Sequence, residues 1–150
     1  MHRFDDGRPL ILGGVTISGA RGLAGHSDAD VLCHAIADAV LGAANLGDIG
    51  EHFPPTDPQW KDASSLALLG RVREMTHEAG YRVSSVDAVL VLAQPKIAPF
   101  RDEMKRNVGA ALNLPADAVG VKATTTDGLG AIGRGEGAAC TAVALVEKAR

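Results

Sequence analysis

The chain has 150 residues, a hydrophobic content of 46%, a charged content of 22% and a formal net charge of −3. These values are typical of one globular domain, residues 1–150, with a core of ordinary size. They exclude a membrane span, since no long apolar run occurs, and they argue against a nucleic-acid partner, since no Lys/Arg cluster stands out. Without a secretory signal pattern, we expect a cytoplasmic protein in which Cys33 and Cys140 are small core residues.

Residues 10–46 predict a hairpin followed by a helix. In "LILGGVTI", two short apolar runs flank a Gly13–Gly14 turn, which is the pattern of a β-hairpin over residues 10–17. Residues 28–46 have an acidic start and an apolar face, which predicts a helix with Ser27 or Asp28 as its N-cap.

The rest of the chain alternates between helical and strand patterns. Residues 47–63 are rich in proline and glycine without a usable period, so we expect a long loop of the kind that often covers a functional site. The further elements expected are a helix capped by Ser64 or Ser65 and ending before Gly80, a strand over 86–93, a helix over 97–114 that starts near Pro99, and strands over 118–126 and 138–146.

The order of elements is therefore strand, strand, helix, helix, strand, helix, strand, strand. The intervening helices allow parallel pairing, whereas the opening and the closing strand pairs are expected to be antiparallel. The predicted fold class is α/β (α+β): a mixed sheet of the four-stranded type, covered by helices, with an N-terminal β-hairpin.

The segment "GHSDADVLCHAIADAV" carries an unusual polar series. His26, Asp30, His34 and Asp38 follow one another at intervals of four residues, which would place them on one face of a helix. The opposite face is apolar. The polar stripe is either a solvated surface or a site.

His34 on its own is more often a structural or exposed histidine. His2, in the polar opening "HRF", lies just before the hairpin, so the fold could bring it to the same helix. Two imidazoles and a carboxylate leave one position open on Zn²⁺, which is the arrangement of a catalytic site.

Other polar groups suit phosphate or a hard cation. Asp127 follows three threonines in "KATTTDGLG" and could hold Mg²⁺, or it could simply end a strand in a turn. Arg134 in "GRGEG" could bind a phosphate or pair with Glu136. Lys96, between two prolines, is a candidate phosphate contact or an exposed lysine.

No Ser-His-Asp or Cys-His arrangement is supported by the spacings, and no nucleotide-binding glycine loop of the standard kinds occurs. What remains is a set of metal and phosphate ligands without an obvious nucleophile. Such a set suits phosphoryl transfer in which the substrate supplies its own nucleophile.

At these residues the sequence resembles a known family. The segments that carry the resemblance are "HRFDDGRPLILGGV", "GHSDADVLCHAIADAVLGAANLGDIGEHFPPTDPQWKDASS", "QPKIAP" and "VKATTTDGLG…GRGEGAAC". Together, and over essentially the whole chain, they resemble the 2-C-methyl-D-erythritol 2,4-cyclodiphosphate synthases of the non-mevalonate isoprenoid pathway.

The resemblance implies a homotrimer with active sites between subunits. It implies conversion of 4-diphosphocytidyl-2-C-methyl-D-erythritol 2-phosphate into the cyclic diphosphate with release of CMP, a phosphorus-oxygen lyase reaction. The 2-phosphate oxygen would attack the β-phosphorus while metal ions neutralise charge.

The resemblance also implies roles for individual residues. His2 and His34 match zinc ligands, and Asp127 matches the residue that holds Mg²⁺ or Mn²⁺. His26, Thr125 and Asp127 match catalytic positions. At the methylerythritol phosphate end, the implied substrate contacts are His26 and Ser27, with Asp38 nearby, and Phe53 and Asp57 in a mobile loop over residues 53–62. The implied ribose contacts are Asp48 and Gly50. At the cytosine and phosphates, the implied contacts are Pro95, Lys96, Ile97, Ala123, Thr124 and Thr125, and Arg134 is a further implied contact.

Two departures from the family pattern carry expectations. The family's third zinc ligand is an Asp two residues before the match to His2, and this chain begins at Met1, so we expect weaker zinc binding than in a chain extended by that Asp. Ala131 stands where many relatives carry an aromatic beside the trimer axis, while Arg134 and Glu136 match the polar residues of that axial cavity. The alternatives left open are a divalent-metal phosphohydrolase and a weakly catalytic trimer that binds metal or isoprenoid.

Overall fold

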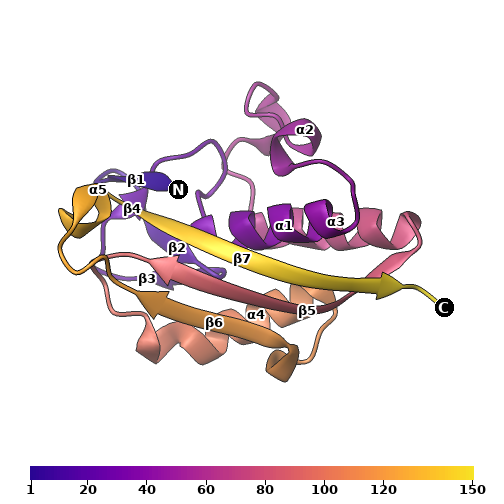
Figure 1. Ribbon diagram of the computed structural model, residues 1–150. Helices are drawn as coiled ribbons and strands as arrows, with labels where there is room; N and C mark the ends of the chain where they lie inside the picture. The colour runs from indigo at the N-terminus through magenta and orange to yellow at the C-terminus, as the bar shows by residue number, and fades with distance from the viewer.

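The computed structural model describes residues 1–150, and its centre is one mixed sheet of five strands in the order β4–β1–β7–β5–β6 (Figure 1). β5 pairs in parallel with β6 and antiparallel with β7, while β1 pairs antiparallel with both β7 and β4. A separate antiparallel pair is formed by β2 and β3. The strand bounds are His2–Asp5 for β1, Leu10–Leu12 for β2, Val15–Ile17 for β3, Gly22–Leu23 for β4, Tyr81–Val91 for β5, Val119–Thr124 for β6 and Gly137–Lys148 for β7.

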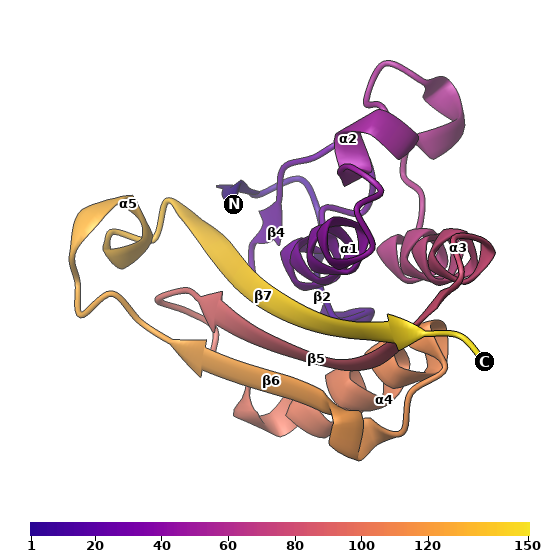
Figure 2. The ribbon, with the colours of Figure 1, turned by 45° about the vertical axis from the view of Figure 1, so that its right-hand side comes forward.

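Three long helices cover one side of the long strands. α1, α3 and α4 lie behind β7, β5 and β6, whose other side carries no helix (Figure 1, Figure 2). The fully buried side chains between the layers include Leu32 of α1, Leu69 of α3, Leu90 of β5 and Met104 of α4. The helices are α1 Val31–Ala43, α2 Ile49–His52, α3 Ser65–Glu78, α4 Arg101–Leu112 and α5 Gly130–Gly133, with 3-10 turns at Pro58–Trp60, Ala98–Phe100 and Ala116–Ala118. None of the helices has both the length and the apolar character needed to cross a bilayer.

The hairpin, the helix after Ser64 and the mixed sheet are confirmed. Gly13 and Gly14 form the hairpin turn with φ of 56° and 71°. A Cβ at Gly14 would lie 2.1 Å from Leu66 Cδ1, so the turn requires glycine for its conformation and for its close packing on α3. Ser64 caps α3 by accepting from the N–H of Ala67, and Gly80 follows the end of the helix.

The four-stranded description is wrong, and the two closing strands do not pair. The unpredicted strands β1 and β4 join the sheet, in which His2 stands opposite Ala138 of β7. β5 lies between β6 and β7, so the last two strands are not neighbours. A four-residue polar strand such as β1 forms because a distant strand pairs with it, and its own residues give little sign of this.

The first long helix begins later than predicted. Ala29 takes a left-handed conformation with φ of 59°, and Asp30 is extended, so the helix starts at Val31 with Asp30 as its N-cap. Ser27 and Asp28 as caps are therefore wrong. His26 and Asp30 precede the helix, so the four-residue series does not form a single helical stripe.

Two smaller differences concern the loop and the cysteines. The segment 47–63 contains α2 and a 3-10 turn, so it is more ordered than the predicted loop. Both cysteines are free thiols; Cys33 is buried as expected, whereas Cys140 is only half-buried at the edge of the core.

One buried carboxylate joins the hairpin to α1. Asp30 is 0% exposed and accepts from the N–H groups of Gly13 at 3.0 Å, Gly14 at 2.8 Å and Cys33 at 3.1 Å. Burial raises the pKa of Asp30, and these three donors act in the opposite direction. The carboxylate therefore fixes the N-terminus of α1 against the hairpin turn.

We predict that Asp30→Ala destabilises the fold by about 3 kcal/mol or more, because it leaves three backbone N–H groups without an acceptor. Chemical denaturation of the variant and of the wild type measures the loss. Asp117→Ala, which removes an exposed carboxylate, is the matched control and should change stability by less than about 0.5 kcal/mol. Similar losses in both variants would contradict this role of Asp30.

Candidate functional site

The two histidines singled out in the sequence meet in the structure. His2 lies on β1 and His34 in the first turn of α1, and their rings stand edge to face with centroids 5.3 Å apart. His2 Nε2 lies 3.1 Å from His34 Nδ1. Two nitrogens bound to one tetrahedral zinc ion are about 3.3 Å apart, given Zn–N bonds of about 2.0–2.1 Å. The predicted convergence is confirmed, with a spacing that fits a shared metal ion.

Burial favours the neutral form of both imidazoles. It lowers the pKa of His34 from 6.5 to about 4, with the neighbouring His2 as the second cause. Burial is also the main reason why the pKa of His2 is lowered. Neutral imidazoles have a lone pair available, which is the state in which histidine binds a metal.

The far nitrogen of His34 contacts two serines. Its Nε2 lies 2.9 Å from Ser65 Oγ and 3.1 Å from Ser27 Oγ. Ser65 in turn donates its hydroxyl to Asp28 Oδ1, and its backbone N–H donates to Asp28 Oδ2 at 2.9 Å. Ser27 was predicted as a site residue. Asp28 and Ser65 were not, because the sequence pattern indicated only that they could cap helices.

These residues line a cavity of about 240 Å³ between β1, α1, α2 and the start of α3. Phe53 and Trp60 form its apolar wall and pack edge to face with centroids 5.0 Å apart. His26 Nε2 contacts the backbone oxygen of Asp57 at 3.1 Å, which ties the segment above the cavity to its rim. The lining residues are His2, His26, Ser27, Cys33, His34, Ala37, Ile49, Gly50, Phe53, Pro55, Trp60, Ser65 and Leu68.

Asp38 and Asp48 bind backbone groups at the edge of α2. Asp38 Oδ1 accepts from the N–H of Ile49 at 2.9 Å, and Asp48 Oδ1 accepts from the N–H of Glu51 at 3.0 Å. Both carboxylates therefore hold α2 beside the cavity. Their predicted contacts with a substrate stay a prediction.

A second hollow, of about 220 Å³, brings together the residues predicted for the cytosine and phosphates. It lies where the parallel strands β5 and β6 end, the usual position of ligand sites in open sheets with parallel strands. Its lining residues are Leu92, Ala93, Pro95, Lys96, Ile97, Ala98, Arg101, Ala123, Thr124 and Thr125. It shares no lining residue with the cavity around His34, so within one chain the two hollows are separate.

Asp127 and Arg134 follow β6 on the surface. Asp127 is exposed, and its N–H donates to Thr125 Oγ1 at 3.2 Å. Arg134 pairs with Glu136, with Nε and Oε1 2.6 Å apart, so the pairing considered for it in the sequence is present.

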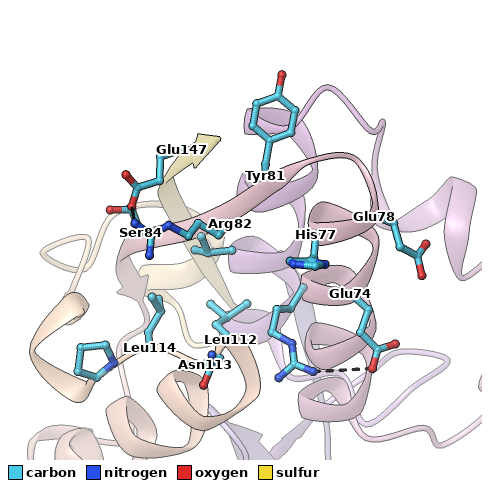
Figure 3. A pocket seen from close by; sticks show the side chains of 13 residues that line it. Glu74, His77, Glu78, Tyr81, Arg82, Ser84, Leu112, Asn113, Leu114 and Glu147 are labelled. Carbon is cyan, nitrogen blue, oxygen red and sulfur yellow. Dashed lines mark ion pairs between the residues drawn. The ribbon is translucent and has the colours of Figure 1, made fainter. Parts of the chain in front are cut away.

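A third hollow lies at the opposite end of the long strands (Figure 3). It is about 550 Å³ in volume and is formed by the ends of α3 and α4 and by β5. Its arginines are paired, Arg73 with Glu74 at 3.7 Å and Arg82 with Glu147 at 3.0 Å. None of the predicted site residues lines it, so it is not the candidate site.

The family model for the YgbB family matches residues 1–147. The chain belongs to the YgbB family. It is 58% identical over 149 residues to the 2-C-methyl-D-erythritol 2,4-cyclodiphosphate synthase of Salinibacter ruber, covering 99% of this chain and 95% of the relative.

Solved structures of similar proteins agree with the fold. The bifunctional IspDF of Campylobacter jejuni matches with a TM-score of 0.92 and 42% identity over 99% of this chain and 40% of that longer protein. A 2C-methyl-D-erythritol-2,4-cyclodiphosphate synthase in its CDP-bound form matches with a TM-score of 0.88 and 35% identity, covering 97% of this chain and 95% of the other. The resemblance seen in the sequence is therefore confirmed.

We predict that the metal-free protein loses the contribution of neutral His34 to its stability as the pH falls from about 6.5 towards about 4. In this range the unfolded chain binds protons that the folded His34 does not, so the free energy of unfolding decreases by up to about 1.4 kcal/mol per pH unit. Urea denaturation at a series of pH values measures the slope. His34→Gln should make it shallower, whereas His77→Gln, on the exposed face of α3, should not; equal slopes in all three proteins would refute the assignment to His34.

Proposed function

We propose that this chain is a 2-C-methyl-D-erythritol 2,4-cyclodiphosphate synthase of the non-mevalonate isoprenoid pathway. It would convert 4-diphosphocytidyl-2-C-methyl-D-erythritol 2-phosphate into the cyclic diphosphate and release CMP. The observation that carries the proposal is the 3.1 Å approach of His2 Nε2 to His34 Nδ1 on the wall of a cavity. A relative of this name with 58% identity over nearly the whole chain supports it.

The two hollows suit the two ends of this substrate. The cavity with His26 and Ser27 would take the methylerythritol phosphate end, and Phe53 and Trp60 would exclude water from it. The hollow at the ends of β5 and β6 would take the cytidine and phosphates. A structure of a similar protein with CDP bound supports a cytidine nucleotide as the ligand class.

We propose that two metal ions take part. We assign Zn²⁺ to His2 and His34, whose neutral nitrogens have the spacing of neighbouring ligands, and Mg²⁺ or Mn²⁺ to the exposed carboxylate of Asp127. No group of three or more His, Cys, Asp or Glu side chains is placed so that it could hold one metal ion. The remaining zinc ligands would therefore be groups other than these two histidines. When bound, the ions neutralise phosphate charge that would otherwise repel an attacking anion.

In the proposed reaction, the 2-phosphate oxygen attacks the β-phosphorus and CMP leaves, which makes the enzyme a phosphorus-oxygen lyase. The chain supplies no nucleophile. Lys96 and Thr125 would hold the diphosphate in line with the attacking oxygen, and His26 would hold the methylerythritol phosphate. Such alignment is equivalent to an effective concentration of about 10⁵ M or more.

We further propose a homotrimer with active sites between subunits. The uncovered side of the sheet exposes apolar residues of β7, with Val143 at 68% and Leu145 at 61% exposure. A second copy would complete the site, because the two hollows of one chain share no lining residue and a neighbouring copy could bring one of each together.

We also propose a cytoplasmic location and no nucleic-acid or membrane partner. The two free thiols Cys33 and Cys140 suit a reducing compartment, and the net charge of −3 does not favour nucleic acid.

We predict that the protein releases CMP and the cyclic diphosphate in equal amounts from the authentic substrate, and that His34→Ala lowers kcat/KM by about 100-fold or more. Product analysis by phosphorus NMR measures both. His77→Ala, which changes a histidine outside both hollows, should retain activity. Free orthophosphate in place of the cyclic product would identify a phosphohydrolase, and release of no product would refute the proposed activity.

We predict that Leu145→Glu prevents assembly, because it places a charge on the apolar face that the trimer would bury. Light scattering after size-exclusion chromatography should give the mass of three chains for the wild type and of one for the variant. Ala110→Glu, which places the same charge on the exposed side of α4, should leave the trimer intact. A monomeric wild type would refute the proposed assembly.

A further inference from the structure

His34 is held through both of its ring nitrogens. Nδ1 faces His2 Nε2 at 3.1 Å, and Nε2 faces Ser65 Oγ at 2.9 Å. A neutral imidazole has one nitrogen that donates and one that accepts. Whichever role Ser65 imposes on Nε2 therefore decides the role of Nδ1, the nitrogen that faces the proposed metal.

The hydroxyl hydrogen of Ser65 is already used in a hydrogen bond to Asp28. Its O–H donates to Asp28 Oδ1, and its backbone N–H donates to Asp28 Oδ2 at 2.9 Å. A carboxylate only accepts, so the hydrogen between Ser65 and Asp28 belongs to the serine. Ser65 is 1% exposed, and Asp28 is the charged acceptor that its hydroxyl contacts. Ser65 Oγ can then only accept from His34, and Nε2 must be the donor.

The neighbouring hydrogen bonds are consistent with Nε2 of His34 as the donor. Asp28 Oδ1 also accepts from the N–H of Asp30 at 3.1 Å, which fixes the carboxylate beside the start of α1. Ser27 Oγ accepts from the N–H of Ala29 at 3.3 Å and lies 3.1 Å from His34 Nε2. Its lone pairs can share the same donated hydrogen, so it does not oppose Ser65.

We infer that Ser65, held by Asp28, is a positioning residue that fixes His34 with its hydrogen on Nε2 and its lone pair on Nδ1. The role rests on the proposed function only in that Nδ1 is the nitrogen assigned to the metal. Hydrogen bonds of this kind to a ligating histidine typically change metal affinity by about 10–100-fold.

The first test needs neither metal nor substrate. In the metal-free wild-type protein near neutral pH, nitrogen-15 NMR of the histidine rings should show His34 with a protonated Nε2, whose hydrogen exchanges slowly with water, and an unprotonated Nδ1. A hydrogen on Nδ1 would overturn the inference. This result is independent of catalysis, so it separates failure of the inference from failure of the proposed activity.

The second test measures Zn²⁺ affinity of the full chain by competition with a chromophoric chelator. Ser65→Ala should bind Zn²⁺ about 10–100-fold more weakly and lose the slowly exchanging Nε2–H signal. Ser64→Ala is the matched control, because the adjacent serine caps α3 through the N–H of Ala67 and does not contact His34. It should bind Zn²⁺ within about twofold of the wild type. Equal affinity of Ser65→Ala and Ser64→Ala would overturn the inference, and the wild-type spectrum decides it if Ser65→Ala does not fold.

Discussion

The carboxylate of Asp30 is the constraint from which the site follows. A buried charge is stable only where hydrogen bonds replace its lost hydration, and here three backbone N–H groups from the hairpin turn and the first turn of α1 do so. Because the carboxylate must reach both segments at once, the start of α1 has one position relative to the hairpin. That position brings His34 Nδ1 within 3.1 Å of Nε2 of His2 on β1.

The neighbouring polar groups extend the same arrangement. Asp28 accepts from the N–H of Asp30 on one side and from Ser65 on the other, so it connects the start of α1 to the start of α3. The cavity therefore lies where two helix starts and one strand meet. Such a frame holds side chains more rigidly than a loop does, which suits a site whose work is the alignment of phosphate groups.

Much of the fold and of the candidate site could be predicted from local sequence, whereas the remaining features depend on contacts between distant parts of the chain. The hairpin and α3 were predictable because Gly13–Gly14 and Ser64 are local signals that the tertiary structure does not override. β1 was not, since its pairing with β7 involves residues at opposite ends of the chain. For the site, fold order allowed His2 to reach His34, and the resemblance to a known family implied that the two histidines meet. The contact of Asp28 with Ser65 was not predicted, because residue spacing along the chain does not show which helices begin next to each other in the fold.

The packing of Trp60 against Phe53 has a practical consequence. Trp60 is the only tryptophan of the chain, and it forms part of the apolar wall of the cavity. The intrinsic fluorescence of the protein therefore originates at that wall. A molecule that enters the cavity changes the environment of the indole, whereas Trp60 does not line the hollow at the ends of β5 and β6 of the same chain. The emission spectrum can thus report occupancy of the cavity without any added label.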